Sequence, residues 1–165
     1  MEFGVSYDIL RTMSKPNLVL ILDNIRSMYN VGAIFRLADG LGVSKLYLVG
    51  ITPTPPRTEI HKTALGAETR VSWEYIKDVR SQMLELKSSG FTVAALEITP
   101  SAIPIHQYKP IFPLALILGH EREGVGESAL ELADVHVMIP MTGQAKSLNV
   151  ATATAIAVHQ ILKTF

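Results

Sequence analysis

The sequence predicts an α/β fold in which helices flank a parallel sheet, and three observations carry this prediction. Short aliphatic runs bounded by Gly, Pro, Asp or Ser recur along the chain, as is typical of strands. These runs are apolar almost without interruption, which indicates strands that are buried on both faces. Helix-like stretches separate the runs, and strands that alternate with helices favour a parallel sheet.

The expected elements follow in chain order. Strands are expected at residues 17–22, 45–49, 91–96, 114–118 and 135–139. Helices are expected at residues 31–41, 74–88, 127–133 and 147–161, and Gly90 follows the second of them as a stop signal. No linker divides the chain, so residues 1–165 are expected to form one domain.

The composition excludes several classes of protein. The 165 residues include no cysteine, which rules out disulfides and thiolate metal sites. The first residues lack the basic start and apolar run of a signal peptide, and no apolar run is long enough to span a bilayer. We therefore expect a cytoplasmic protein with no membrane partner.

The formal net charge is zero, which weighs against a non-specific nucleic-acid binder. Local basic patches remain open, because Arg57, His61, Lys62 and Arg70 fall close together in the sequence. The alternative interpretation is that these are scattered solvated charges.

Three polar clusters follow strand-like runs. Ligands of open α/β sheets bind beyond the carboxyl ends of the strands, so the clusters are expected to form one composite site. In the first cluster, residues 23–36, Asn30 is expected to cap the helix that follows it. Arg36 lies about one and a half turns into that helix. It could serve the site, or it could pair on the surface with Asp39.

The second cluster, residues 118–126, contains three glycines, including Gly119. Its spacing is not that of a dinucleotide-binding loop, and no Walker A lysine follows. Glu121 could hold a neighbouring loop by accepting backbone N–H bonds, could cap a helix, or could act in acid–base chemistry.

The third cluster, residues 139–150, joins a strand to the final helix, where free backbone N–H groups favour small polar ligands. Ser147 is expected to cap this helix, with Asn149 in its first turn. Met141 and Leu148 could line an apolar slot. The five histidines lack the spacing of metal ligands, so no metal site is expected. Tyr29 and Trp73 could stack on bases, although burial is the expected fate of Trp73.

Taken together, the clusters resemble the three motifs of the SpoU/TrmH branch of the SPOUT RNA methyltransferases. Residues 30–36 match N-x-G-A-x-x-R, residues 118–124 contain G-x-E-x-x-G, and residues 139–150 match IPM-x-G-x-x-x-SLNV. The resemblance runs from about residue 17 to residue 161. It implies a five- or six-stranded parallel α/β fold with a deep C-terminal trefoil knot, which our own assignment of strands could not give.

The resemblance also implies an activity. It implies methyl transfer from S-adenosylmethionine to a ribose 2′-hydroxyl of RNA, in a homodimer whose site lies at the subunit interface. The residues at the catalytic motif positions are Asn30, Arg36, Glu121, Ser147 and Asn149. Those implied to touch the cofactor are Leu96, Glu97, Gly119, Ile139, Met141, Ser147 and Leu148.

Several alternatives stay open. Our hypothesis is that Arg36 contacts the 2′-oxygen and a phosphate while Ser147 and Asn149 orient it. Arg36 would either remove the proton or stabilise the developing alkoxide. The substrate could be tRNA or rRNA, and the absence of a separate RNA-binding domain favours tRNA. The rivals are a non-catalytic RNA-binding homologue and an unrelated enzyme that binds a nucleotide phosphate at residues 119–126.

Overall fold

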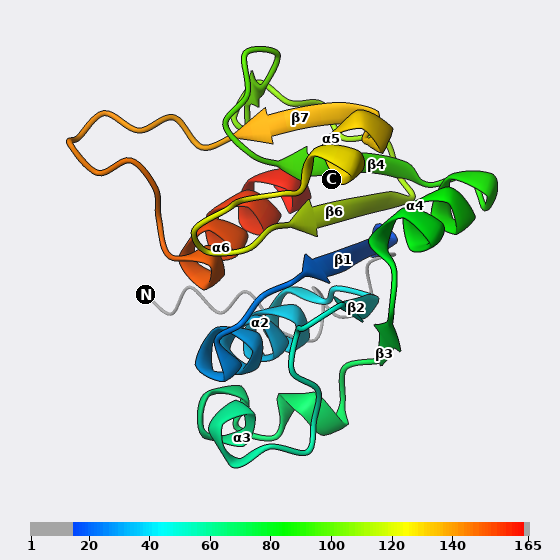
Figure 1. The fold of residues 1–165 in the computed structure, drawn as a ribbon, viewed down its shortest axis with the longest axis vertical. Helices are drawn as coiled ribbons and strands as arrows, with labels where there is room; N and C mark the ends of the chain where they lie inside the picture. The colour runs from blue at the N-terminus through cyan, green and yellow to red at the C-terminus, as the bar shows by residue number, and fades with distance from the viewer. Residues whose placement is uncertain (1–14, 164–165) are drawn as a thin grey trace, which may run out of the picture.

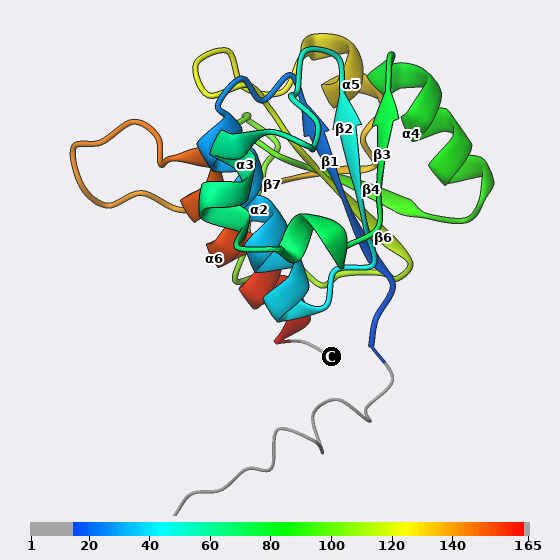
Figure 2. The same cartoon turned by 90° about the horizontal axis from the view of Figure 1, so that it is seen from below.

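A computed structural model of the chain describes residues 15–163, and these form a seven-stranded parallel sheet with helices on both faces (Figures 1 and 2). The strands are β1 (Leu18–Asp23), β2 (Lys45–Val49), β3 (Trp73–Ile76), β4 (Thr92–Leu96), β5 (Ile103–Pro104), β6 (Leu114–Leu118) and β7 (Val135–Met138). Their order across the sheet is β3-β2-β1-β6-β4-β7-β5, and all neighbouring pairs are parallel. The domain expected over residues 1–165 thus extends beyond the described residues at both ends.

The strands face two separate cores, which explains why their sequences are apolar without interruption. In β1, Leu18, Leu20 and Leu22 pack towards α2 (Met28–Leu41), α3 (Thr58–Ala64) and α6 (Val150–Leu162). Val19 and Ile21 pack towards α4 (Val79–Ser88) and α5 (Glu127–Leu132) on the other face. Every residue of β1 and β6 is buried. The prediction of a parallel sheet covered on both faces is confirmed.

The helix expected over residues 74–88 is wrong in its first part. Residues Trp73–Ile76 form the edge strand β3, which pairs with β2, and α4 begins only at Val79. Asp78 is the N-cap of α4, and its side chain accepts a hydrogen bond from the backbone N–H of Ser81. The aromatic and β-branched residues before Asp78 favour the strand, and the cap sets where the helix begins.

The sheet also has more strands than the five runs in the sequence, or the five or six implied by the resemblance. The additional strands are β3 and the two-residue β5, which pairs with β7 at one edge. Helix α3 and a short 3₁₀ turn, η1 (Ala67–Thr69), were not predicted. Only Ile60 and Ala64 of this seven-residue helix are buried, so its apolar face is too short to show a clear helical periodicity in the sequence.

Both expected helix caps are displaced. Helix α2 begins at Met28, and the Ser27 side chain accepts a hydrogen bond from the N–H of Asn30. Asn30 therefore lies in the first turn and is not the cap. Helix α6 begins at Val150, and the cap is Asn149 rather than Ser147. In each case two residues of a good capping type lie close together in the sequence, and the N-cap is the one whose non-helical backbone directly precedes the first turn.

The loops that carry the polar clusters meet at one edge of the sheet. The arrowheads of β1, β2 and β3 point the same way in Figure 2. Strand β6 lies between β1 and β4, so the loop after β6 is flanked by the loops after these two strands. The segment 139–149 leaves β7 and projects from the body of the molecule before α6 begins (Figure 1).

Candidate functional site

A chain of three side chains joins the three polar clusters at the carboxyl edge of the sheet. The amide of Asn30 donates through Nδ2 to Oε1 of Glu121, with a donor–acceptor distance of 3.3 Å. The Nδ2 of Asn149 donates to Oδ1 of Asn30 at 3.0 Å. The structure therefore brings together one predicted catalytic residue from each cluster.

Glu121 holds the loop that precedes α2. Its two carboxylate oxygens accept hydrogen bonds from the backbone N–H groups of Arg26 and Ser27, each at 3.3 Å. Burial alone would raise the pKa of Glu121, but the hydrogen bonds to its carboxylate lower this pKa overall. A carboxyl with a lowered pKa is a poor proton acceptor, so these contacts favour the loop-holding interpretation over acid–base work.

Asn149 contributes to both the site and the start of α6. Its Oδ1 accepts hydrogen bonds from the backbone N–H groups of Ala151 and Thr152, at 2.9 and 3.2 Å. These bonds satisfy two of the free donors at the helix N-terminus. The Nδ2 of the same amide donates to Asn30, so the orientation of this one amide group links the start of α6 to the hydrogen-bonded series of Asn30 and Glu121.

A pocket that Glu121 also lines opens between the loops after β4, β6 and β7. The predicted cofactor residues Leu96, Glu97, Gly119, Ile139, Met141, Ser147 and Leu148 all line it. The side chains of Leu96, Ile139, Met141 and Leu148 supply apolar walls. Their role in binding a cofactor remains a prediction, but the structure places all seven around one hollow.

The carboxylate of Glu97 is engaged within the protein. Its Oε2 accepts a hydrogen bond from the N–H of Val125 at 2.9 Å, and its Oε1 accepts one from the N–H of Ile98 at 2.9 Å. Gly124 has a positive φ of 71°, and a side chain there would overlap this carboxylate. Glu97 thus ties the loop after β4 to the loop after β6.

Arg36 is the one predicted catalytic residue that lies apart from this group. It is exposed on α2, six residues beyond Asn30, and it does not line the pocket. Six residues correspond to about 240° of helical rotation, so the two side chains leave α2 on different faces. The alternative pairing with Asp39 is wrong, because Asp39 pairs with Arg70 at 2.6 Å.

The sequence did not single out every residue of the pocket. His120 also lines it, and its Nδ1 accepts hydrogen bonds from the N–H groups of Arg122 and Glu123, at 3.1 and 3.2 Å. The predicted catalytic residue Glu121 lines the pocket as well, and other lining residues that were not predicted as site residues are Ile98, Leu118, Arg122, Gly124, Met138, Val150 and Ala153. Most of them adjoin predicted residues in sequence, so extending each motif to its strand end would have found them.

Other expectations can be compared with the structure only for residues 15–163. Within this range, no group of three His, Cys, Asp or Glu side chains could hold a metal ion. No helix of the described residues is long and apolar enough to cross a membrane. Tyr29 is half exposed, whereas Trp73 is partly buried and packs against a hydrophobic core.

Comparisons with known proteins agree with the motifs. Residues 17–159 match the model of the SpoU rRNA Methylase family. The tRNA (guanosine(18)-2'-O)-methyltransferase of Thermus thermophilus is 33% identical over 88% of this chain and 74% of its own length. The Escherichia coli K12 enzyme of the same name is 29% identical over 88% of this chain, and the match spans only 63% of that enzyme.

Solved structures share the fold. The Aquifex aeolicus TrmH/SpoU tRNA modifying enzyme has a TM-score of 0.82 at 28% identity, over 91% of this chain and 76% of that one. An AdoMet-bound rRNA methyltransferase from Sinorhizobium meliloti has a TM-score of 0.83 at 24% identity, over 91% of this chain and 57% of that one. The family model covers well over half of the residues and all three polar clusters, and the chain belongs to the SpoU rRNA Methylase family.

Proposed function

We propose that the protein transfers a methyl group from S-adenosylmethionine to a ribose 2′-hydroxyl of RNA. The observation that carries the proposal is the hydrogen-bonded series of Glu121, Asn30 and Asn149, whose first member also lines the pocket that the motif residues surround. The matched region spans 63% of the Escherichia coli relative and 74% of the Thermus thermophilus relative, and the activity in their names supports the proposal.

The residues of the pocket fit this cofactor by their chemistry. Leu96, Ile139, Met141 and Leu148 offer apolar surfaces that suit an adenine ring and the methylene groups of a methionine chain. Bound S-adenosylmethionine would supply an electrophilic methyl carbon. Ser147 lines the same pocket and offers a hydroxyl at its exposed side.

In this proposal Glu121 acts by position, because it accepts hydrogen bonds from the loop before α2 and from Asn30. Asn30 and Asn149 would orient the ribose and the groups that contact it. Arg36 would lie beside the 2′-oxygen and stabilise the negative charge that develops there, since a guanidinium stays protonated near neutral pH, and the hydroxyl proton would pass to solvent. Positioning and charge stabilisation would then supply most of the rate enhancement.

We further propose that the protein acts as a homodimer in which Arg36 reaches the site of the partner subunit. Arg36 and Tyr29 are seven residues apart and leave α2 on the same face, and both are exposed. Ile156, on the neighbouring helix α6, is 40% exposed. An exposed face with apolar and cationic side chains is what a subunit interface near a shared site would require.

The deep C-terminal trefoil knot also belongs to the proposal. Support comes from the family match and from the long segment 139–149, which separates β7 from α6 beside the pocket. The substrate that we favour is tRNA, because the Thermus thermophilus and Escherichia coli relatives are named as tRNA methyltransferases. We expect the protein to act in the cytoplasm, where such a substrate is found.

The test is incubation of the pure protein with radiolabelled S-adenosylmethionine and total RNA, separated into tRNA and rRNA and digested to nucleosides. Label in a 2′-O-methylnucleoside from tRNA is the expected result. Label from rRNA alone would overturn the choice of substrate but keep the reaction. Cofactor binding without transfer to any RNA would instead favour a non-catalytic RNA-binding homologue.

The dimer has its own test. Arg36→Ala and Asn149→Ala proteins should each lose at least about 10-fold in activity, and mixing them after partial unfolding should restore part of that loss through mixed dimers. Activity that never recovers, in mixtures shown to exchange subunits, would contradict a site shared between subunits.

A further inference from the structure

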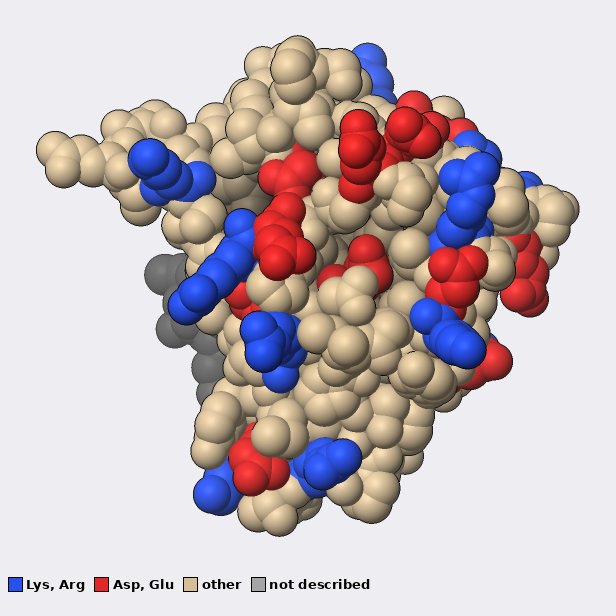
Figure 3. Space-filling model, in the orientation of Figure 1, with Lys and Arg blue, Asp and Glu red and all other residues tan. Residues whose placement is uncertain are grey.

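Four exposed cations lie along the edge of the sheet that carries the site. Arg57 follows β2, Arg26 follows β1 and Arg122 follows β6, and these three strands are neighbours in that order. Lys62 is exposed on α3, directly after the loop that ends at Arg57. We call these four residues the cationic row. Figure 3 shows Lys and Arg side chains along the left side of the view, towards which the arrows of β1 and β6 point in Figure 1, with Asp and Glu side chains among them.

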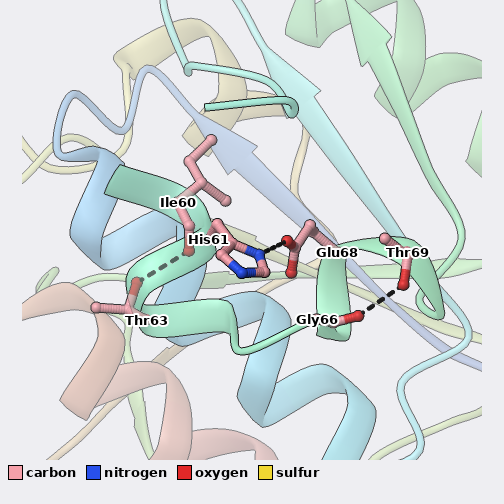
Figure 4. A network of polar contacts seen from close by, with 6 residues as sticks. All are labelled: Ile60, His61, Thr63, Gly66, Glu68 and Thr69. Carbon is pink, nitrogen blue, oxygen red and sulfur yellow. Dashed lines mark hydrogen bonds and ion pairs between the residues drawn. The ribbon is translucent and has the colours of Figure 1, made fainter. Parts of the chain in front are cut away.

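The cationic row is what remains after the other basic groups near α3 have been paired. Arg70 pairs with Asp39, with 2.6 Å between Nη2 and Oδ2. His61 contacts Glu68, with 2.6 Å between Nδ1 and Oε1 (Figure 4). The ion pairs found among residues 15–163 involve Lys45, His61, Arg70 and Lys87, and no residue of the row.

The loops that carry the row are fixed to one another. The Thr52 hydroxyl donates to the carbonyl of Leu22 at 2.9 Å and accepts from the N–H of Ile25 at 3.0 Å, which joins the loop after β2 to the loop after β1. Glu121 joins the loop after β6 to the N–H of Arg26. The three arginines are thus held on a connected frame rather than on independent loops.

Helix α3 belongs to the same frame. The hydroxyl of Thr63 donates to the carbonyl of Tyr29 at 2.9 Å. At Gly32, α3 approaches α2 so closely that a Cβ would overlap the carbonyl of Ile60 and the hydroxyl of Thr63. The position of Lys62 relative to the site is therefore set by helix packing.

The acidic side chains of this edge are mostly engaged elsewhere. The carboxylates of Glu97 and Glu121 accept backbone hydrogen bonds. Asp23 is only 5% exposed, and burial, with a smaller contribution from Asp78, raises its pKa. Glu123 is exposed and lines the same hollow as Arg26, so it is the residue there that would repel an anion.

We propose that the cationic row binds the sugar–phosphate backbone of the RNA whose ribose enters the pocket. This inference rests on the proposed function and adds to it the surface that holds the RNA. The loops after three neighbouring strands each carry one exposed arginine, so the guanidinium groups lie near the same edge of the sheet. Guanidinium groups bind phosphates through paired N–H donors, and such contacts position an RNA without reading its sequence. A chain of zero net charge can bind RNA in this way, because four of its exposed basic groups lie together near one edge of the sheet.

The experiment measures binding of fluorescently labelled, unfractionated tRNA by anisotropy between 0.05 and 0.3 M salt (about a sixfold range). The test protein is the double variant Arg57→Gln/Lys62→Gln, since neither residue lines the cofactor pocket. Each lost phosphate contact should reduce the slope of log K against log salt by about 0.7–0.9. This corresponds to about five- to eightfold weaker binding per contact at 0.1 M salt, so about 25- to 60-fold for the pair.

Two matched variants sharpen the result. Lys163→Gln removes an exposed cation at the far end of α6, the opposite end from the site, and should leave both affinity and slope unchanged. Glu123→Gln removes the opposing carboxylate and should tighten tRNA binding. Wild-type slope in the double variant, or an equal loss in Lys163→Gln, would overturn the inference.

Failure of this inference is distinguishable from failure of the proposed function. S-adenosylmethionine binding, measured by calorimetry, should be equal in the wild type and in Arg57→Gln/Lys62→Gln. If the wild type methylates tRNA while the double variant binds tRNA normally, only the cationic row is refuted. If the wild type binds neither cofactor nor tRNA, the proposed function itself fails.

Discussion

Asn149 offers the sharpest test of the site, because one side chain has two separable roles. Its Oδ1 caps α6 through the N–H groups of Ala151 and Thr152, and its Nδ2 donates to Asn30. Asn149→Ala removes both roles. Asn149→Asp keeps a good capping oxygen but cannot donate, so it removes only the link to Asn30.

The magnitudes follow from these contacts. Loss of an N-cap costs about 1 kcal/mol, within a range of about 0.5–2 kcal/mol. The 3.0 Å bond to Asn30 lies on an exposed part of the surface, so its loss adds about 0.5 kcal/mol. Asn149→Ala should therefore lower the free energy of unfolding by about 1.5 kcal/mol, or Tm by about 3–6 °C. Asn149→Asp should stay within about 0.5 kcal/mol of the wild type, because Asp caps as well as Asn and carries a charge that suits a helix N-terminus.

Activity should separate from stability in this pair. Both variants lose the bond that orients Asn30, so both should lose about 10- to 100-fold in the rate of methyl transfer to tRNA, as expected for a misplaced reacting group. Urea unfolding gives the stability and single-turnover transfer gives the rate. The aspartate protein should be nearly as stable as the wild type but as slow as the alanine protein.

Either of two results would refute this reasoning. If Asn149→Asp is as unstable as Asn149→Ala, the side chain does not act as a cap of the kind described. If Asn149→Asp transfers methyl groups at the wild-type rate, the link to Asn30 has no part in the reaction.

Three further outcomes are expected. Gly32→Ala should destabilise the fold by about 1–3 kcal/mol, because its Cβ would overlap α3, whereas Gly40→Ala on the same helix has open space and should gain up to about 1 kcal/mol in urea unfolding. The pKa of Asp23 is raised, first by burial and then by Asp78. Its ionisation therefore lowers the free energy of unfolding: the loss is absent below the unfolded pKa of about 3.9 and complete above the folded pKa. Asp23→Asn should therefore gain in stability over the wild type as pH rises through that window, and equal pH profiles would contradict this. The pKa of Glu121 is lowered, so its ionised carboxylate stabilises the fold above the unfolded pKa of about 4.3, and this stabilisation is lost as the pH falls through the folded pKa. When the free energy of unfolding is measured at falling pH, Glu121→Gln should lack that loss.

The centre of the fold was predictable from sequence because burial is complete there. Strands β1 and β6 are buried at every residue, so their apolar runs are unbroken. The edge strand β3 has no buried residue, and the exposed Glu74 and Tyr75 interrupt its apolar run, so in the sequence it resembles the start of the helix after it. Strand β5 has two residues and exists only through its pairing with β7, a long-range contact that no local pattern encodes.

The site shows a similar division. The residues around the pocket follow from motifs at strand ends, and the structure places all seven expected ones together. The capping roles were wrong because Ser27 and Asn30, or Ser147 and Asn149, are equally good caps by residue type. What decides is the backbone conformation at the start of each helix: Ser27 and Asn149 have non-helical backbone there and cap α2 and α6.

The sheet, more than the polar contacts, assembles the site. Asn30 lies 91 residues from Glu121 and 119 residues from Asn149, yet the bonds between them are 3.3 and 3.0 Å long and partly exposed. Contacts of this kind contribute about 1 kcal/mol each, which is too little to offset the closure of such long loops. The parallel register of the strands brings these loops together. Leu22 pairs with Leu118 and Leu118 with Leu96, so the loops after β1, β6 and β4 leave the sheet at the same level. The polar chain then selects the final orientation of side chains that the buried strands have already brought together.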